Sequence, residues 1–262
     1  MYDTQMVLAA IDQNRWPILA LCSLAMICNY TWFFAAVFRG FRDQVYPIPV
    51  FCTLFWLCGD GSVVLDYYKA FHVIDHWYVK LFWAALTLTV ACELVFLYMT
   101  LRFGRKEIAP SLSQSQFRFL ILGGLALMAV AWAFTKHLIN EDLFINYFHL
   151  ANMAGPAFAW SMILSRRSRA GTSPMIWIAY TLMVMCWFTA TALWFGEPFA
   201  SPLYLAFYAA VTLSAAATAW IVMRMPVAVA VSGGEEGQRA PGEPVMGFAR
   251  GNASGSLRAQ SR

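Results

Sequence analysis

The chain has 262 residues, of which 60% are apolar and only 12% are charged, and its formal net charge is +4. A soluble domain carries roughly 25% charged residues, so this composition excludes an ordinary water-soluble protein and places much of the surface against lipid. Basic residues form no stripe on a polar fold, which excludes nucleic-acid binding. Aromatic residues make up 16% of the chain, and this surplus over what interfacial belts require predicts an aromatic-lined interior.

Seven apolar windows, each about long enough to cross a bilayer core, follow one another along the chain. They cover residues 16–38, 48–68, 77–101, 117–135, 145–165, 174–196 and 202–223. Beyond Val227, Gly, Ser, Pro, Arg and Glu dominate, which is typical of disorder. The sequence therefore predicts an all-α polytopic membrane protein with an N-terminal segment (1–15), a seven-helix transmembrane domain (16–225) and a disordered cytosolic tail (226–262).

The charge of the connections alternates along the chain. Net charges of +1, +3 and +3 fall on residues 39–45, 102–118 and 165–171. The intervening connections are neutral or negative, with 0 on residues 66–80, −1 on 136–142 and −1 at Glu197. Because positively charged loops stay in the cytosol, we predict that the N-terminus lies outside and the C-terminus inside.

Cysteine and histidine do not form the pattern of a metal site. The six cysteines fall inside apolar windows without CxxC spacing, so we interpret them as packing residues. His72 and His76 lie four residues apart, a spacing that can bind a metal or haem, but their short polar connection favours a solvated interface. The last window contains no Lys, which excludes a retinal Schiff base. We therefore predict no metal and no cofactor.

Asp60 lies near the middle of the second window. A carboxylate at mid-depth costs about 2.5–3.5 kcal/mol on insertion scales and usually faces the bundle interior. Gly59 and Gly61 leave room for a ligand or a backbone to approach, and Trp56 and Tyr67 share its helical face. Desolvation would keep this acid neutral and able to donate a proton. The structural alternative is a hydrogen bond to a neighbouring helix.

Glu93 is the second intramembrane acid, two-thirds of the way along the third window. Two interpretations stay open. Its carboxyl group could hydrogen-bond the carboxyl group of Asp60 inside the bundle, or it could pair with a loop arginine and support the cytosolic end of its helix.

Several short motifs then follow in a fixed order. Asn29-Tyr30 precedes Arg42-Asp43-x-x-Tyr46-x-Ile48-Pro49, and Asp60 follows eleven residues after that proline. Further on, Glu93 precedes a Tyr-x-Thr-x-x-x-Gly stretch (98–104), and residues 167–173 form a turn rich in Arg, Ser and Gly. Over residues 16–225, this order resembles the small seven-helix integral-membrane terpene cyclases of fungal meroterpenoid and indole-diterpene pathways and their bacterial relatives.

The resemblance implies a reaction and its residues. In that family the second helix carries a proton-donating Glu, and Asp60 falls on its position. Metal-free, cofactor-independent cyclisation of a lipophilic prenylated substrate is implied, in an endoplasmic-reticulum-type membrane for a fungal protein or an inner membrane for a bacterial one. Asp60 and Glu93 would be catalytic. Aromatic residues at suitable depth would stabilise a carbocation: Trp56, Tyr67, Trp160, Trp187 and Tyr208.

The chain departs from the family at three points. Trp56 stands where the family has Asn, and Gly59 where it has Trp. Asp60 is one methylene shorter than the family's Glu. The last window has no carboxylate, so either Glu93 or Glu197 would supply the second acid, or the chemistry differs from that of the family.

Two other classes of protein compete with the cyclase. A seven-helix carrier or accessory protein predicts a polar passage rather than a closed aromatic pocket around Asp60. A haem-binding electron carrier requires two histidines that face each other at mid-depth, and the sequence places no such pair.

Overall fold

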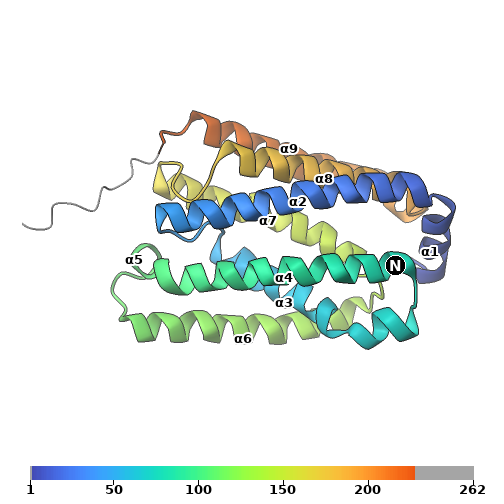
Figure 1. Ribbon diagram of the computed structural model, residues 1–262, viewed down its shortest axis with the longest axis horizontal. Helices are drawn as coiled ribbons and strands as arrows, with labels where there is room; N and C mark the ends of the chain where they lie inside the picture. The colour runs from blue at the N-terminus through green and yellow to red at the C-terminus, as the bar shows by residue number, and fades with distance from the viewer. Residues whose placement is uncertain (1, 228–262) are drawn as a thin grey trace, which may run out of the picture. The chain divides into compact units, whose positions relative to one another are not determined.

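The computed structural model describes residues 2–227, most of which lie in helices and none of which forms a strand (Figure 1). This confirms the predicted all-α class for that part of the chain. Seven long helices form its body: α2 (Arg15–Asp43), α3 (Val50–Leu65), α4 (Trp77–Phe103), α6 (Gln114–Ile139), α7 (Ile145–Arg166), α8 (Pro174–Trp194) and α9 (Pro202–Arg224). Except for Pro226 and Val227, the predicted tail (226–262) lies outside the described residues.

Five of these helices are long and apolar enough to cross a membrane by length and composition, namely α2, α4, α6, α8 and α9. They identify a polytopic membrane protein. Helix α3 is apolar but has only 16 residues, or about 24 Å of helix. Helix α7 has 22 residues but is interrupted by polar residues and by Pro156.

Four short helices lie before or between the long ones. They are α1 (Thr4–Gln13), the π-helix η1 (Lys69–Val73), α5 (Arg105–Ile108) and the 3-10 helix η2 (Glu197–Ala200). Helix α1 falls within the predicted N-terminal segment, where Asp3 caps it by accepting a hydrogen bond from the Met6 N–H at 2.9 Å. Serine caps begin three of the long helices, at Ser113, Ser173 and Ser201, because a serine oxygen satisfies a free N–H of the first turn.

The connections gather at two opposite ends of the bundle (Figure 1). At one end, Arg166 binds the Glu107 carboxylate at 2.9 Å and donates to the Tyr46 carbonyl at 2.8 Å, while the Gly171 N–H donates to Asp43. These residues belong to the three connections with positive charge. The neutral and negative connections meet at the other end.

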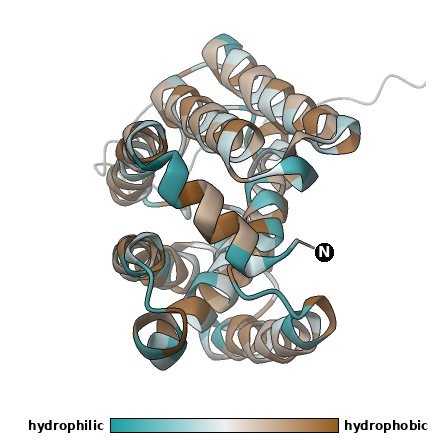
Figure 2. Ribbon diagram, turned by 90° about the vertical axis from the view of Figure 1, so that its right-hand side faces the viewer, coloured by the Kyte–Doolittle hydropathy of each residue, from teal (hydrophilic) through white to brown (hydrophobic). Residues whose placement is uncertain are grey.

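The helices pack in two groups around an interior space. Helix α2 packs along α8, and α8 along α9, whereas α3 packs against α4 and α6. Helix α7 contacts both α3 and α9. Hydrophobic residues also cover outward-facing parts of the helices (Figure 2); on α6, for example, Phe119 is 81% exposed and Leu127 is 71% exposed. Such outer faces suit contact with lipid.

Candidate functional site

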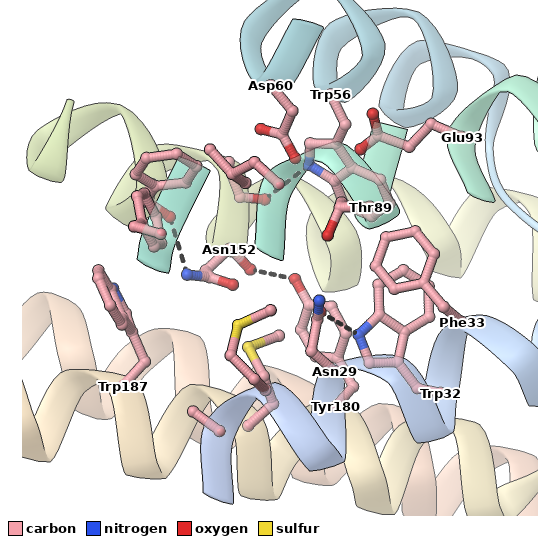
Figure 3. A pocket seen from close by; sticks show the side chains of 17 residues that line it. Asn29, Trp32, Phe33, Trp56, Asp60, Thr89, Glu93, Asn152, Tyr180 and Trp187 are labelled. Atoms are coloured by element: carbon pink, nitrogen blue, oxygen red, sulfur yellow. Dashed lines mark hydrogen bonds between the residues drawn. The ribbon is translucent and has the colours of Figure 1, made fainter. Parts of the chain in front are cut away.

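A cavity of about 90 Å³ lies between the two helix groups (Figure 3). Seventeen residues from α2, α3, α4, α7 and α8 line it. Seven of them are aromatic: Trp32, Phe33, Trp56, Phe82, Phe148, Tyr180 and Trp187. Five are polar or acidic: Asn29, Asp60, Thr89, Glu93 and Asn152. The aromatic surplus expected from composition therefore does enclose an interior space.

Two carboxylic acids open into this cavity from neighbouring helices. Asp60 on α3 is 6% exposed and Glu93 on α4 is 1% exposed, and the two groups are close enough to interact directly. None of the 17 lining residues is Lys, Arg or His. Two buried carboxyl groups that share a cavity without a cation each disfavour the ionised form of the other.

This position decides between the two interpretations of Glu93. Within residues 2–227 it forms no ion pair with an arginine, so the loop-arginine interpretation is wrong. Its neighbour is the other acid. Glu197, the alternative second acid, is exposed in η2 and does not line the cavity.

Tyr147 of α7 holds the Asp60 side chain. Its hydroxyl donates a hydrogen bond to Asp60 Oδ1 at 2.9 Å, and the tyrosine is 1% exposed. The ring fits because residue 59 is glycine: a Cβ at Gly59 would come within 1.9 Å of the Tyr147 oxygen. Gly61 has nothing within 4 Å of that position. Of the two glycines expected to allow close approach, only Gly59 does so, and it admits a side chain rather than a ligand or a backbone.

Pro156 shapes the α7 wall of the cavity. A proline inside a helix cannot donate to the carbonyl four residues earlier, which here belongs to Asn152. The Tyr180 hydroxyl donates to that freed carbonyl at 2.7 Å. One residue earlier, the Ala151 carbonyl accepts a hydrogen bond from Trp56 Nε1 at 3.0 Å. These bonds fix two aromatic walls, one from α8 and one from α3.

The aromatic side chains form two packed groups. On one side Trp32 contacts Trp56 and Tyr180, with ring centroids 5.8 and 5.5 Å apart. On the other side Phe82 contacts Phe148 and Trp187, at 4.7 and 5.7 Å.

Three buried polar atoms that line the cavity have no hydrogen-bond partner in the described part of the chain. They are Thr89 Oγ1, Glu93 Oε2 and Trp187 Nε1. Buried polar atoms normally find partners. These three are therefore free to bind a polar group of an occupant.

The structure brings four of the predicted site residues together, because Asp60, Glu93, Trp56 and Trp187 all line the cavity. The other three lie elsewhere. Tyr67 is 46% exposed and stacks on Phe71 at 4.4 Å. Trp160 is 40% exposed and donates to Thr218. Tyr208 packs on Phe188 at 5.1 Å.

Tyr67 misses the cavity because α3 breaks at Asp66. The interval of seven residues from Asp60 therefore no longer keeps one helical face. Depth in the membrane alone indicates Trp160 and Tyr208, and depth does not determine direction around a helix.

His149 is the buried histidine of the described chain, at 4% exposure. Its Nε2 lies 2.9 Å from the Tyr204 hydroxyl, and it does not line the acid cavity. The haem interpretation requires a second histidine opposite it, but His76 lies at one end of the bundle, 3.2 Å from Asp12.

The cavity combines an acid pair, free polar atoms and aromatic faces in a space without a basic residue. Such a site is suited to moving a proton next to a surface that stabilises a cation. Comparisons of the chain with protein-family models, with curated proteins and with solved structures found no match.

Proposed function

We propose that this chain is a membrane-embedded terpene cyclase that starts the cyclisation of a lipophilic prenylated substrate by protonating it. The observation that carries the proposal is the Asp60–Glu93 pair, which opens into a cavity whose largest class of lining residues is aromatic. The competing carrier would instead expose its acids to a polar passage. The order of sequence motifs supports the same proposal independently.

In this proposal Asp60 delivers the proton. The acid transfers it to a terminal epoxide oxygen, the C–O bond breaks, and the electrons of a neighbouring alkene form the new C–C bond; an alkene terminus would take the proton at carbon. Glu93 supplies the second carboxyl group of the pair, and the Tyr147 hydroxyl orients Asp60. The final carbocation loses a proton to the carboxylate, so substrate and product have equal mass.

The aromatic walls supply the remaining stabilisation. A desolvated cation over an aromatic face gains about 2 kcal/mol or more. Apart from the aromatic faces and the acid pair, the lining of the cavity offers the carbocation no negatively charged partner.

Feeding experiments test the acid. Membranes that contain the chain would be given epoxidised and unoxidised prenyl substrates, and mass spectrometry would detect mass-neutral isomers. Asp60→Asn should lower turnover by about 100-fold or more, the typical contribution of a general acid. Asp66→Asn is the matched control, since Asp66 ends the same helix but binds Lys136 at 3.0 Å outside the cavity. Undiminished turnover in a folded Asp60→Asn protein would refute the assignment.

We also propose that all seven long helices cross the membrane, with the N-terminus outside. The distribution of charge supports this proposal, because the three positively charged connections lie together at one end of the bundle. The proposed location is an endoplasmic-reticulum-type membrane or a bacterial inner membrane.

A further inference from the structure

The acid cavity is too small for a whole prenyl chain. Its volume is about 90 Å³, whereas an engineered protein cavity of about 150 Å³ holds a single benzene. Only one end of an extended isoprenoid therefore fits beside Asp60. The rest of such a molecule needs a second apolar space that connects with the first.

A groove of about 290 Å³ between α2 and α4 meets this requirement. Its walls are mainly apolar and include Ile18 and Cys22 of α2 and Leu81 of α4. It lies on the outer face of the bundle, since Leu81 is 55% exposed and Ile27 is 64% exposed. Tyr30 hydrogen-bonds the Ala85 carbonyl at 2.8 Å, which ties the two helices together across the groove.

The groove and the acid cavity share three wall residues: Met26, Phe82 and Trp187. Among the described hydrogen bonds, none holds any of these three side chains. Phe82 and Trp187 contact each other only through stacked rings, and methionine adapts readily to different neighbours. The partition between the two spaces is therefore made of side chains that can turn without breaking a polar contact.

The far part of the groove reaches a polar cluster. Trp77, which lines the groove, donates through Nε1 to Asp12 at 2.6 Å. The Arg15 guanidinium lies 4.9 Å from the Trp77 ring centroid. An amphiphile in the groove would thus have its apolar chain between α2 and α4 and its polar end beside this cluster.

From this continuity we infer that the groove binds the isoprenoid chain of the substrate while the reactive end passes between Met26, Phe82 and Trp187 to reach Asp60. The substrate enters sideways from the lipid. The inference rests on the proposed function for the identity of the substrate, but binding can be measured without turnover.

Photolabelling tests the groove directly. A diazirine derivative of farnesol would be irradiated with membranes that contain the full chain, and labelled peptides would be identified by mass spectrometry. Label should concentrate on residues 18–30 and 77–85, and excess farnesol should displace it. Ala85→Trp fills the groove and should reduce labelling about tenfold, since a large side chain placed in a packed space is costly.

Ala84→Trp is the matched control, because Ala84 is exposed and does not line the groove. It should leave labelling unchanged. If Ala85→Trp fails to fold, Cys22→Phe fills the same groove from the opposite wall. Uniform label over outward faces such as that of α6, or displacement by phospholipid as effective as by farnesol, would overturn the inference.

The two proposals fail separately. Asp60→Asn should retain photolabelling in the groove while it loses turnover. Groove labelling without turnover of any prenyl substrate would refute the cyclase and support the groove. Turnover without groove labelling would refute the groove alone.

Discussion

The orientation of the Asp60 side chain depends on the absence of a side chain at residue 59. Gly59 leaves the space that the Tyr147 hydroxyl occupies, and that hydroxyl donates to Asp60. A neighbour with any side chain would displace the tyrosine. The identity of residue 59 therefore matters through the orientation of the acid, not through backbone flexibility.

Gly59→Ala tests this dependence. The new Cβ would come within 1.9 Å of the Tyr147 oxygen, so we expect a loss of about 1–3 kcal/mol of stability from overpacking. Thermal unfolding in detergent would measure it. Gly61→Ala is the matched control: it meets nothing within 4 Å, and alanine favours helix by about 1 kcal/mol over glycine. Equal melting temperatures for the two variants would contradict the packing argument.

Tyr147→Phe isolates the hydroxyl from the ring. The ring keeps filling the space beside Gly59, while Asp60 loses a buried donor, so we expect turnover to fall by up to about tenfold as a hydrogen bond between neutral groups, worth about 0.5–1.5 kcal/mol, is lost. Turnover of the prenyl substrates would be measured on membranes with equal amounts of folded protein. Tyr208→Phe, outside the cavity, should leave turnover unchanged; equal effects would show that orientation of Asp60 is unimportant.

At the scale of the helix, α7 combines the weakest membrane signal with the greatest structural role. Its polar residues and Pro156 keep it out of the set of apolar helices, yet its carbonyl groups anchor side chains from α3 and α8. A hydropathy pattern shows the polar character of α7 but not the hydrogen bonds that its carbonyl groups accept.

A double-mutant cycle tests the role of Pro156. Tyr180→Phe leaves the Asn152 carbonyl without its donor and should cost about 1–3 kcal/mol in the natural chain. In the Pro156→Ala background, the new N–H of residue 156 can bind that carbonyl, so the same tyrosine change should cost clearly less. Thermal unfolding of the four proteins would measure the difference. An equal cost in both backgrounds would show that the proline does not free the carbonyl.

Hydropathy predicted every long helix, because apolar windows and their polar breaks are local properties of the sequence. It placed Asp60 and Glu93 in the interior for the same reason. Tyr147 could not be found in this way, since its contact with Asp60 spans 87 residues and depends on the packing of α7 against α3. Tyr67 was misplaced because the break of α3 at Asp66 has no strong local signal.

For the whole molecule, the two ends of the bundle differ in charge and in how they are held together. At the end near α1, Asp142 binds Lys69 at 2.8 Å and Thr4 at 3.1 Å, and Asp12 accepts from Trp77. The hydrogen bond from Lys69 lowers the pKa of Asp142, and that from Trp77 lowers the pKa of Asp12. Both carboxylates thus tie α1 or its neighbours to the bundle in their ionised form.

Acid should therefore release α1 before the other helices. Because both folded pKa values lie below the unfolded value of about 3.9, this stabilisation is present above that pH and is lost as the pH falls through the folded values. Hydrogen-exchange protection of residues 4–13, corrected for the intrinsic exchange rate, should fall as the pH drops from about 5 to below about 3, while α8 stays protected. Asp142→Asn should reduce the pH dependence of this protection. An unchanged pH dependence would show that Asp142 does not hold α1 in place.

The charge difference between the ends also predicts orientation. The connections with net charges of +1, +3 and +3 share one end, and positive loops stay in the cytosol. A thiol reagent that cannot cross membranes, applied to intact bacterial cells that express the chain, should label Glu197→Cys but not Ser111→Cys, since both positions are exposed, the first between α8 and α9 and the second between α5 and α6. Disruption of the cells should expose the second site.

The unsubstituted chain gives the background, because its six cysteines lie within α2, α3, α4 and α8. The reverse pattern would place the N-terminus in the cytosol, and labelling of both sites from outside would contradict the opposed ends of the bundle.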